Sequence, residues 1–162
     1  MAENTKTITS AANPAIKRLR GLDQKKNRDA EGVFVVEGAR HVNEALAEGW
    51  QLDTLASSPR AGDDPAIAAA RKMKAQCLEV TDDLLSRITG RDNAHAVIGV
   101  FRQRIAKLDA AGEGLWVALE GVRDPGNLGT IIRSCDAVKA QGVLLLGQTC
   151  DPWSPEAVRA TM

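Results

Sequence analysis

The sequence predicts an α/β protein, and two observations support this prediction. Short β-branched runs alternate with helical patterns along most of the chain, as expected when helices pack on a sheet. Aromatic residues make up only 3% of the 162 residues and tyrosine is absent, so the core must be aliphatic and rich in alanine. Such a core suits a helix-covered sheet better than a β-sandwich.

The charge and hydropathy of the chain exclude some broad classes. The 21 basic and 21 acidic residues cancel, so any polyanionic partner must be inferred from where the charges lie. No stretch reaches the roughly 18 consecutive apolar residues of a membrane span. The polar start lacks the apolar core of a signal peptide. We therefore expect a cytoplasmic protein without a membrane partner.

A basic helix is predicted near the N-terminus. It begins at Pro14, behind an asparagine N-cap, and ends at a glycine. Its cations are Lys17, Arg18 and Arg20, and further basic residues follow at 25–28 in a polar, turn-like stretch. Two interpretations stay open here, a solvated helix face or a patch that tracks phosphates.

The alternation of strands and helices continues to residue 101. Repeated β-α-β units predict a mostly parallel sheet with helices on its faces, within a first domain that spans 1–106. The predicted strands are 32–38, 52–57, 77–80 and 96–101, and the predicted helices are 39–49, 65–75 and 82–88.

A second domain begins after a polar, glycine-containing linker at 107–114. Within 115–162 we expect a strand, a helix to about Ala140, a parallel strand at 142–147, and a last helix capped by Ser154. Two parallel strands with one crossover helix leave both sheet edges exposed. We therefore expect this part to be the first half of a larger α/β domain.

The segment DPGNLGTIIRSCDA, at 124–137, follows a predicted strand and opens a helix. It is not a P-loop, because Asn127 and Leu128 stand where lysine and a hydroxyl residue are required. It is not a dinucleotide fingerprint, because only Gly126 and Gly129 of the three glycines are present. An N-x-G-x-x-x-R pattern remains at the mouth of the helix.

Each residue of this pattern carries an expectation. Asn127 is a strong N-cap candidate. Gly129 costs about 1 kcal/mol relative to alanine inside a helix, which suggests that something approaches the backbone closely there. Arg133 lies off the apolar stripe formed by Ile131, Cys135 and Val138, so it is available to an anion held at the helix N-terminus.

An alternative for Arg133 is a surface ion pair with Asp136 or Glu120. Without such a pair, a cation near the positive end of a helix is destabilised unless an anion binds there as well. The pattern therefore indicates an anion or polar ligand at the carboxyl end of a parallel strand, where open α/β sheets commonly bind ligands.

A resemblance to a known family rests on this segment together with two others. FVVEGARHVNEAL, ALEGVRDPGNLGTIIRSCDAVKAQGVLLL and DPWSPEAVRATM resemble the SpoU (TrmH-like) branch of the SPOUT superfamily, RNA ribose 2′-O-methyltransferases that use S-adenosylmethionine. The resemblance implies an N-terminal α/β/α sandwich of ribosomal-protein type that binds structured rRNA or tRNA. It implies that the second domain is the first half of a SPOUT α/β-knot domain.

The resemblance also implies residue roles. It places Arg133 at the catalytic centre and gives Asn127 a part in shaping it. Because an arginine side chain stays protonated, we assign Arg133 to gripping the target phosphate and polarising the nucleophile. In the first domain we predict RNA contacts from charge and position. In the second domain we predict one contact from the close approach to the backbone expected at the helix glycine. These candidates are Lys17, Arg18, Arg20, Arg40 and Gly129.

The family builds its methyl-donor pocket from motifs that are expected beyond Met162. No donor-binding residue can therefore be named here, and we expect this chain alone to be inactive. The resemblance implies a homodimer for the complete protein. The alternative function is a noncatalytic RNA-binding module, which would keep the sandwich and lose the chemistry.

No metal is expected. The three cysteines, Cys77, Cys135 and Cys150, lie far apart, and neither His41 nor His95 has a partner at ligand spacing. Among the aromatic residues, Trp50 and Phe34 are expected in or at the edge of the core, while Trp153 lies near the predicted ligand end.

Overall fold

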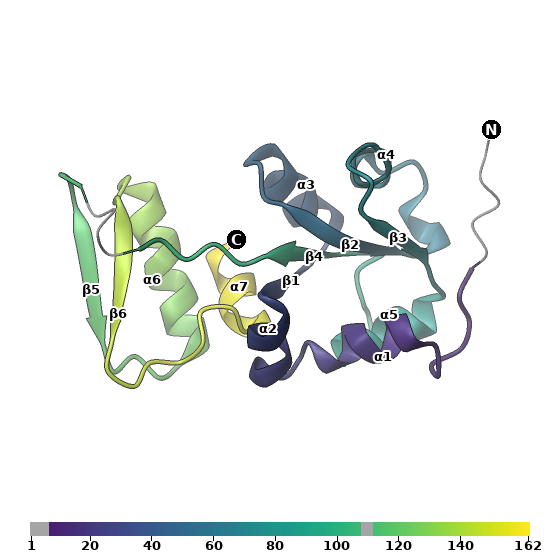
Figure 1. The fold of residues 1–162 in the computed structure, drawn as a ribbon, viewed down its shortest axis with the longest axis horizontal. Helices are drawn as coiled ribbons and strands as arrows, with labels where there is room; N and C mark the ends of the chain where they lie inside the picture. Colours follow the sequence, from purple (N-terminus) through teal and green to yellow (C-terminus); the bar gives the residue numbers. More distant parts are fainter. Residues whose placement is uncertain (1–6, 108–111) are drawn as a thin grey trace. The chain divides into compact units, whose positions relative to one another are not determined.

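A computed structural model describes residues 7–107 and 112–162, so part of the predicted linker lies outside the described residues. The chain divides into two compact units, Met1–Arg102 and Gln103–Met162. Figure 1 draws both units. No helix within the described ranges is long and apolar enough to cross a membrane.

The first unit is a three-layer sandwich. Figure 1 shows α1 and α5 along one face of its sheet and α3 and α4 along the other. This confirms the predicted α/β/α arrangement. Its elements are α1 (Pro14–Gly21), α2 (Lys25–Glu31), β1 (Val33–Glu37), α3 (Ala39–Ala47), β2 (Leu52–Ser57), the 3-10 turn η1 (Pro59–Ala61), α4 (Pro65–Lys72), β3 (Gln76–Glu79), α5 (Asp82–Thr89) and β4 (Val97–Arg102).

The prediction of a mostly parallel sheet is wrong. The strand order is β1-β4-β2-β3, and β4 runs antiparallel to both of its neighbours, so only β2 and β3 pair in parallel. The antiparallel direction of β4 follows from the path of the chain after β3. The chain enters β4 at the carboxyl end of β2, where Val97 pairs with Ser57. Helix α5 therefore does not return the chain to the amino end of β2, as a parallel crossover would.

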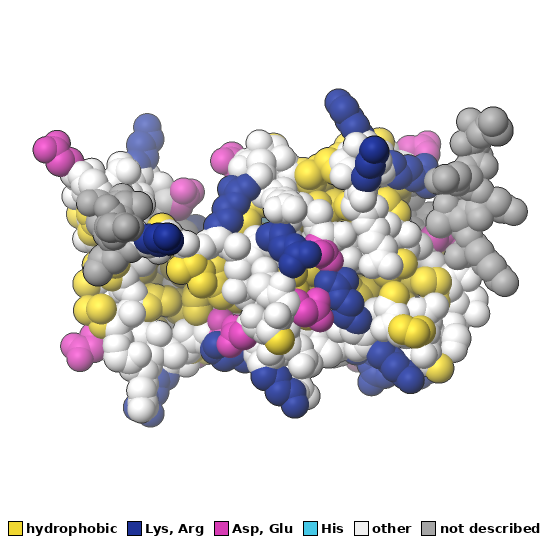
Figure 2. Space-filling view, in the orientation of Figure 1, with side chains coloured by type: hydrophobic (Ala, Val, Ile, Leu, Met, Phe, Trp, Pro, Cys, Tyr) yellow, Lys and Arg dark blue, Asp and Glu magenta, His cyan; other side chains and the backbone are white. Residues whose placement is uncertain are grey.

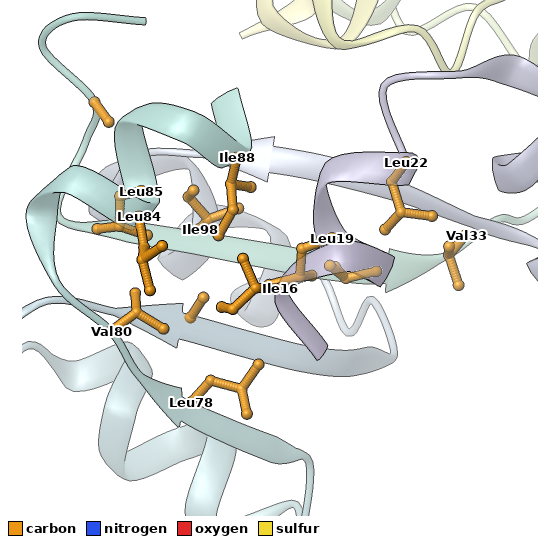
Figure 3. Close-up of a cluster of buried hydrophobic side chains, with 13 residues drawn as sticks. Ile16, Leu19, Leu22, Val33, Leu78, Val80, Leu84, Leu85, Ile88 and Ile98 are labelled. Carbon is orange, nitrogen blue, oxygen red and sulfur yellow. The ribbon is translucent and has the colours of Figure 1, made fainter. Parts of the chain in front are cut away.

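One core cluster fills the space between the sheet and the helices α1 and α5. Figure 3 shows aliphatic side chains from both helices meeting those of the sheet. The cluster is entirely aliphatic, as the composition predicts. Its labelled members include Ile16, Leu19, Val80, Leu84, Leu85, Ile88 and Ile98.

Helix α2 was not predicted, because its sequence KKNRDAE has no large apolar residue to mark a buried face, and Ala30 is exposed. The residue that it buries is Arg28, which is 2% exposed. The Arg28 guanidinium donates from Nη1 to the carbonyl oxygens of Leu22 and Asp23, at 2.7 and 2.6 Å. This arginine therefore holds the turn between α1 and α2.

A cluster of ion pairs and hydrogen bonds ties the helices to the amino edge of the sheet. Arg18 donates to Glu31, Thr54 and Asp53 at 2.7, 2.9 and 2.7 Å. Arg102 donates to the other oxygen of Asp53 at 2.7 Å and to the Glu31 carbonyl at 2.9 Å. We call these five residues the Asp53 cluster. It joins α1, α2, β2 and β4.

Asp53→Asn is expected to destabilise the first unit by about 2 kcal/mol at pH 7, because it removes charged hydrogen bonds. Burial raises the pKa of Asp53, but the hydrogen bonds from Arg18 and Thr54 and the charges of Arg18 and Arg102 lower it below its ordinary value overall. The stabilisation is therefore present above the unfolded-state pKa and is lost as pH falls through the folded-state pKa. Hydrogen exchange of the β2 and β4 amides measures both effects.

The matched control is Asp29→Asn, because the ion pair that Asp29 makes within the described ranges is with exposed Lys25 one helical turn away. This change should cost less than about 1 kcal/mol. Equal protection of β2 and β4 in the two variants at pH 7 would show that the Asp53 cluster contributes nothing special.

Within residues 112–162 the second unit contains two strands and two helices, as predicted. Strands β5 and β6 pair in parallel, with Trp116 opposite Gly142 and Glu120 opposite Leu146. The crossover helix lies between them in sequence. The elements are β5 (Trp116–Glu120), α6 (Pro125–Ala137), β6 (Gly142–Leu146) and α7 (Pro155–Thr161).

Candidate active site

The start of α6 is fixed by Asp124. Its side-chain oxygen Oδ1 accepts a hydrogen bond from the backbone N–H of Asn127 at 2.6 Å, and Pro125 occupies the first helical position. The prediction that Asn127 caps this helix is therefore wrong. Proline disfavours the helical conformation for the residue before it, so the helix begins one residue after Asp124, whose side chain is free to cap.

Asn127 lies instead in the first turn of α6, with its side chain exposed. Its backbone N–H is used by the cap, whereas no residue of the described ranges hydrogen-bonds its side-chain amide. An exposed amide offers both donors and an acceptor. Asn127 is therefore available to a ligand at the start of α6.

Gly129 is required by a helix crossing. A Cβ atom at this position would clash with the Ala157 carbonyl oxygen and would lie 2.6 Å from Ala160 Cβ, both on α7. The close approach that we predicted is therefore present, but α7 makes it. We assigned Gly129 to RNA contact because a glycine in this position suggests a close neighbour. Packing against α7 explains the glycine, so the assignment to RNA is no longer supported.

Arg133 lies on the exposed surface of α6. Its Nη1 donates to the Met162 carbonyl oxygen over a long 3.4 Å. Within the described ranges it has no ion pair, so the predicted alternative of pairing with Asp136 or Glu120 is not observed. The guanidinium is therefore free to bind an anion with its planar fork of donors.

The apolar stripe predicted for α6 is only partly present. Cys135 is buried and Ile131 is half-buried, but Val138 is 62% exposed at the end of the helix. The stripe fails at Val138 because the helix ends at Ala137. At the other end of the stripe Leu128, next to Gly129, is fully buried.

The loops that follow β5 and β6 are joined, because the Cys150 N–H donates to the Val122 carbonyl at 2.8 Å. Burial raises the pKa of the Cys150 thiol, and the charges of Asp124, Asp151 and Glu156 raise it further. These carboxylates show that the capping side of α6 is locally acidic. Sequence reasoning missed Asp124, although an aspartate before proline could have indicated the cap.

The RNA contacts predicted in the first unit differ in how free they are. Lys17 and Arg20 are exposed on α1, and Arg40 is 85% exposed and pairs with Glu44 one turn away at 3.0 Å. Arg18 is different, because three of its donors already serve the Asp53 cluster. Lys17, Arg20 and Arg40 are therefore the stronger candidates.

The geometry of α6 does not include a metal centre. In the part of the chain that the structure describes, no three His, Cys, Asp or Glu side chains gather to hold an ion. What α6 presents is an exposed amide and an exposed guanidinium. Such groups can orient a substrate and stabilise negative charge.

Two family comparisons match successive parts of the chain. Residues 13–99 match the family described as the MRM3-like substrate binding domain. Residues 114–162 match the SpoU rRNA Methylase family.

Individual relatives agree with these matches. The 23S rRNA (guanosine(2553)-2'-O)-methyltransferase RlmP of Bacillus subtilis is 31% identical over 156 residues, which cover 96% of this chain and 60% of the relative. The crystal structure of AdoMet-bound rRNA methyltransferase from Sinorhizobium meliloti has a TM-score of 0.87 and 45% identity, with coverage of 96% of this chain and 60% of that one. The SpoU methyltransferase AviRb from Streptomyces viridochromogenes, in complex with AdoMet, has a TM-score of 0.78 and 26% identity. The match covers 92% of this chain and 58% of AviRb. This chain thus spans about 60% of the length of such relatives.

Proposed function

The chain belongs to the family of the MRM3-like substrate binding domain, and because residues 114–162 also match the SpoU rRNA Methylase family, we propose that it acts in ribose 2′-O-methylation of rRNA with S-adenosylmethionine as methyl donor. The first unit would bind the RNA, and the second would supply the first part of the catalytic domain. The observation that carries the proposal is the exposed Arg133 on α6, which has no ion pair within the described ranges.

The relatives support this reaction class in two ways. One relative is named for 2′-O-methylation of a guanosine of 23S rRNA, and a structural neighbour is described with AdoMet bound. In the proposed reaction the methyl group leaves the donor's sulfonium and bonds to the ribose 2′-oxygen, which loses its proton. We further propose a homodimer and a cytoplasmic location.

Arg133 and Asn127 are assigned different parts in this reaction. The Arg133 guanidinium would bind the phosphate beside the target ribose through its planar fork of donors and stabilise charge on the nucleophile. The Asn127 amide would help to hold the ribose. No residue of this chain is assigned to S-adenosylmethionine.

RNA binding by the first unit would rest on exposed cations. Figure 2 shows Lys and Arg side chains spread over the face drawn, with Asp and Glu between them. Lys17 and Arg20, for which no ion pair is found in the described ranges, are the proposed phosphate contacts on α1. Exposed ion pairs are weak, so Arg40, which pairs with Glu44, also stays available to phosphate.

Lys17→Ala and Arg20→Ala are each expected to weaken binding to a 23S rRNA transcript and to reduce the slope of log affinity against log salt by about 1. Filter binding between 50 and 200 mM salt, roughly the range over which such slopes are read, measures both quantities. Arg18→Lys is the control, because Arg18 serves the Asp53 cluster and its replacement should leave the slope unchanged. Wild-type affinity that did not fall with salt would contradict the basic contact surface.

A second candidate function is a noncatalytic RNA-binding module, which the complete three-layer sandwich of the first unit favours. The two functions are separated by a chimera of this chain with the part of the Sinorhizobium meliloti enzyme that the match leaves uncovered. Methylation of rRNA by the chimera supports the catalytic function. Salt-sensitive RNA binding without donor binding, measured by calorimetry on a folded chimera, supports the module.

A further inference from the structure

In the first unit one ring side chain is well exposed and could stack on an RNA base. Phe34, Phe101 and Trp50 form a single cluster, with ring centroids 5.2 Å apart for Phe34 and Trp50 and 6.1 Å apart for Phe34 and Phe101. The chain has no tyrosine. His41 is half-buried, and its Nδ1 lies 3.1 Å from the Glu37 carbonyl oxygen. His95 is the ring of this unit that is exposed.

The backbone of Gly38 supports one side of the His95 ring. A Cβ atom built on Gly38 would lie 3.4, 3.5 and 3.6 Å from three atoms of the imidazole. Gly38 has φ of +98°, a conformation that side chains rarely adopt, and its N–H donates to the Val97 carbonyl at 2.9 Å.

The segment that carries His95 is held at several points along its length. The Arg60 guanidinium donates from Nη2 to the Ala94 carbonyl at 3.0 Å, and the Ser58 N–H donates to the Ala96 carbonyl at 2.9 Å. Ala94 itself is 4% exposed. A ring on a fixed backbone loses little freedom when a ligand binds it, so the position is preorganised.

Two arginines lie on the two segments that meet at Gly38 and His95. Arg40 follows Gly38 in the first turn of α3, and its side chain is 85% exposed. Arg91 precedes His95, and its Nη1 lies 3.7 Å from Glu37 Oε2, next to Gly38. A flat exposed ring, with arginines on the two segments that meet beside it, matches what single-stranded RNA offers, a base plane joined to phosphates.

We propose that His95, supported by Gly38, is the platform on which an unpaired base of the RNA stacks, with Arg40 and Arg91 binding the adjoining phosphates. This inference rests on the proposed RNA-binding function. It adds to that function a position where the RNA must be unpaired, at the carboxyl edge of the first unit's sheet.

The test is filter binding of a 23S rRNA transcript to the full chain. His95→Ala is expected to weaken binding by about 5- to 100-fold, the range found when base-stacking rings are truncated. His95→Phe keeps a ring and should stay within about threefold of the wild type. Neither change should alter the salt slope, whereas Arg40→Ala should lower it by about 1.

The control is Lys72→Ala. Lys72 ends α4 before β3 begins, so it lies toward the amino edge of the sheet, away from His95. This variant should bind like the wild type. If His95→Ala also binds like the wild type, or if His95→Phe loses as much affinity as His95→Ala, the stacking platform is overturned while RNA binding stands. If the wild-type chain binds no RNA, both proposals fall.

Discussion

Gly129→Val is expected to unfold the second unit and to leave the first unit folded. The new side chain would point at the Ala157 carbonyl and at Ala160 Cβ, which a Cβ atom would meet at 2.6 Å. A backbone carbonyl cannot rotate away as a flexible side chain can, so α6 and α7 must separate. Overpacking of this kind costs up to about 3 kcal/mol. A unit of this size has little stability to lose.

Hydrogen exchange measured by mass spectrometry separates the two units in one experiment. In Gly129→Val, peptides from α6 and β6 should lose protection, while peptides from β2 and β4 should keep it. Gly126→Ala is the control on the same helix, because a Cβ there would meet only an oxygen of the Asp124 side chain, at 3.3 Å. Its effect should stay within about 1 kcal/mol. Unchanged protection of α6 in Gly129→Val would contradict the crossing.

Arg133→Lys is expected to lower the kcat of the chimera by about 100-fold, the scale of losing one well-placed donor to developing charge. Lysine keeps the positive charge but lacks the planar fork that binds a phosphate through two parallel hydrogen bonds. RNA affinity should change much less, because many cations share the binding of the RNA backbone. Single-turnover methylation with rRNA in excess of its Kd isolates the chemical step.

Lys139→Arg is the control for Arg133→Lys. Lys139 is exposed just beyond the end of α6, so exchanging its cation should leave kcat unchanged. Activity of Arg133→Lys within about twofold of the wild type would mean that the geometry of the guanidinium has no part in the reaction.

Three helix starts show which parts of the fold could be predicted from the sequence. The caps at Asn13 and Ser154 were predicted correctly, because each precedes a proline and accepts a bond from the first turn. The same rule applied to α6 selects Asp124, which also precedes a proline, in place of the predicted Asn127. Local chemistry was sufficient in all three places.

Other parts depend on contacts between distant segments. Periodicity predicted β4 as a strand, but its place between β1 and β2 depends on where the chain returns to the sheet. Helix α2 has no large apolar residue, and the residue that it buries is Arg28, bonded to the preceding turn. Neither feature leaves a mark within a short window of sequence.

The candidate site shows the same division. Arg133 was predicted from its position off the apolar stripe, and it is exposed. The prediction for Gly129 was half right. A glycine inside a helix indicates that a neighbour comes close, but it does not show which neighbour. His95 could not be found in this way, because its support comes from Gly38 across the sheet edge. For Arg18, the partners that occupy it come from α2 and β2.

Nucleoside mass spectrometry of 23S rRNA incubated with the chimera and S-adenosylmethionine tests the central claim most directly. The account predicts a single new nucleoside that carries its methyl group on the ribose 2′-oxygen, and it predicts that Arg133→Lys strongly reduces the yield. A folded chimera that binds rRNA and the donor but transfers no methyl group, or that methylates a base, would contradict it.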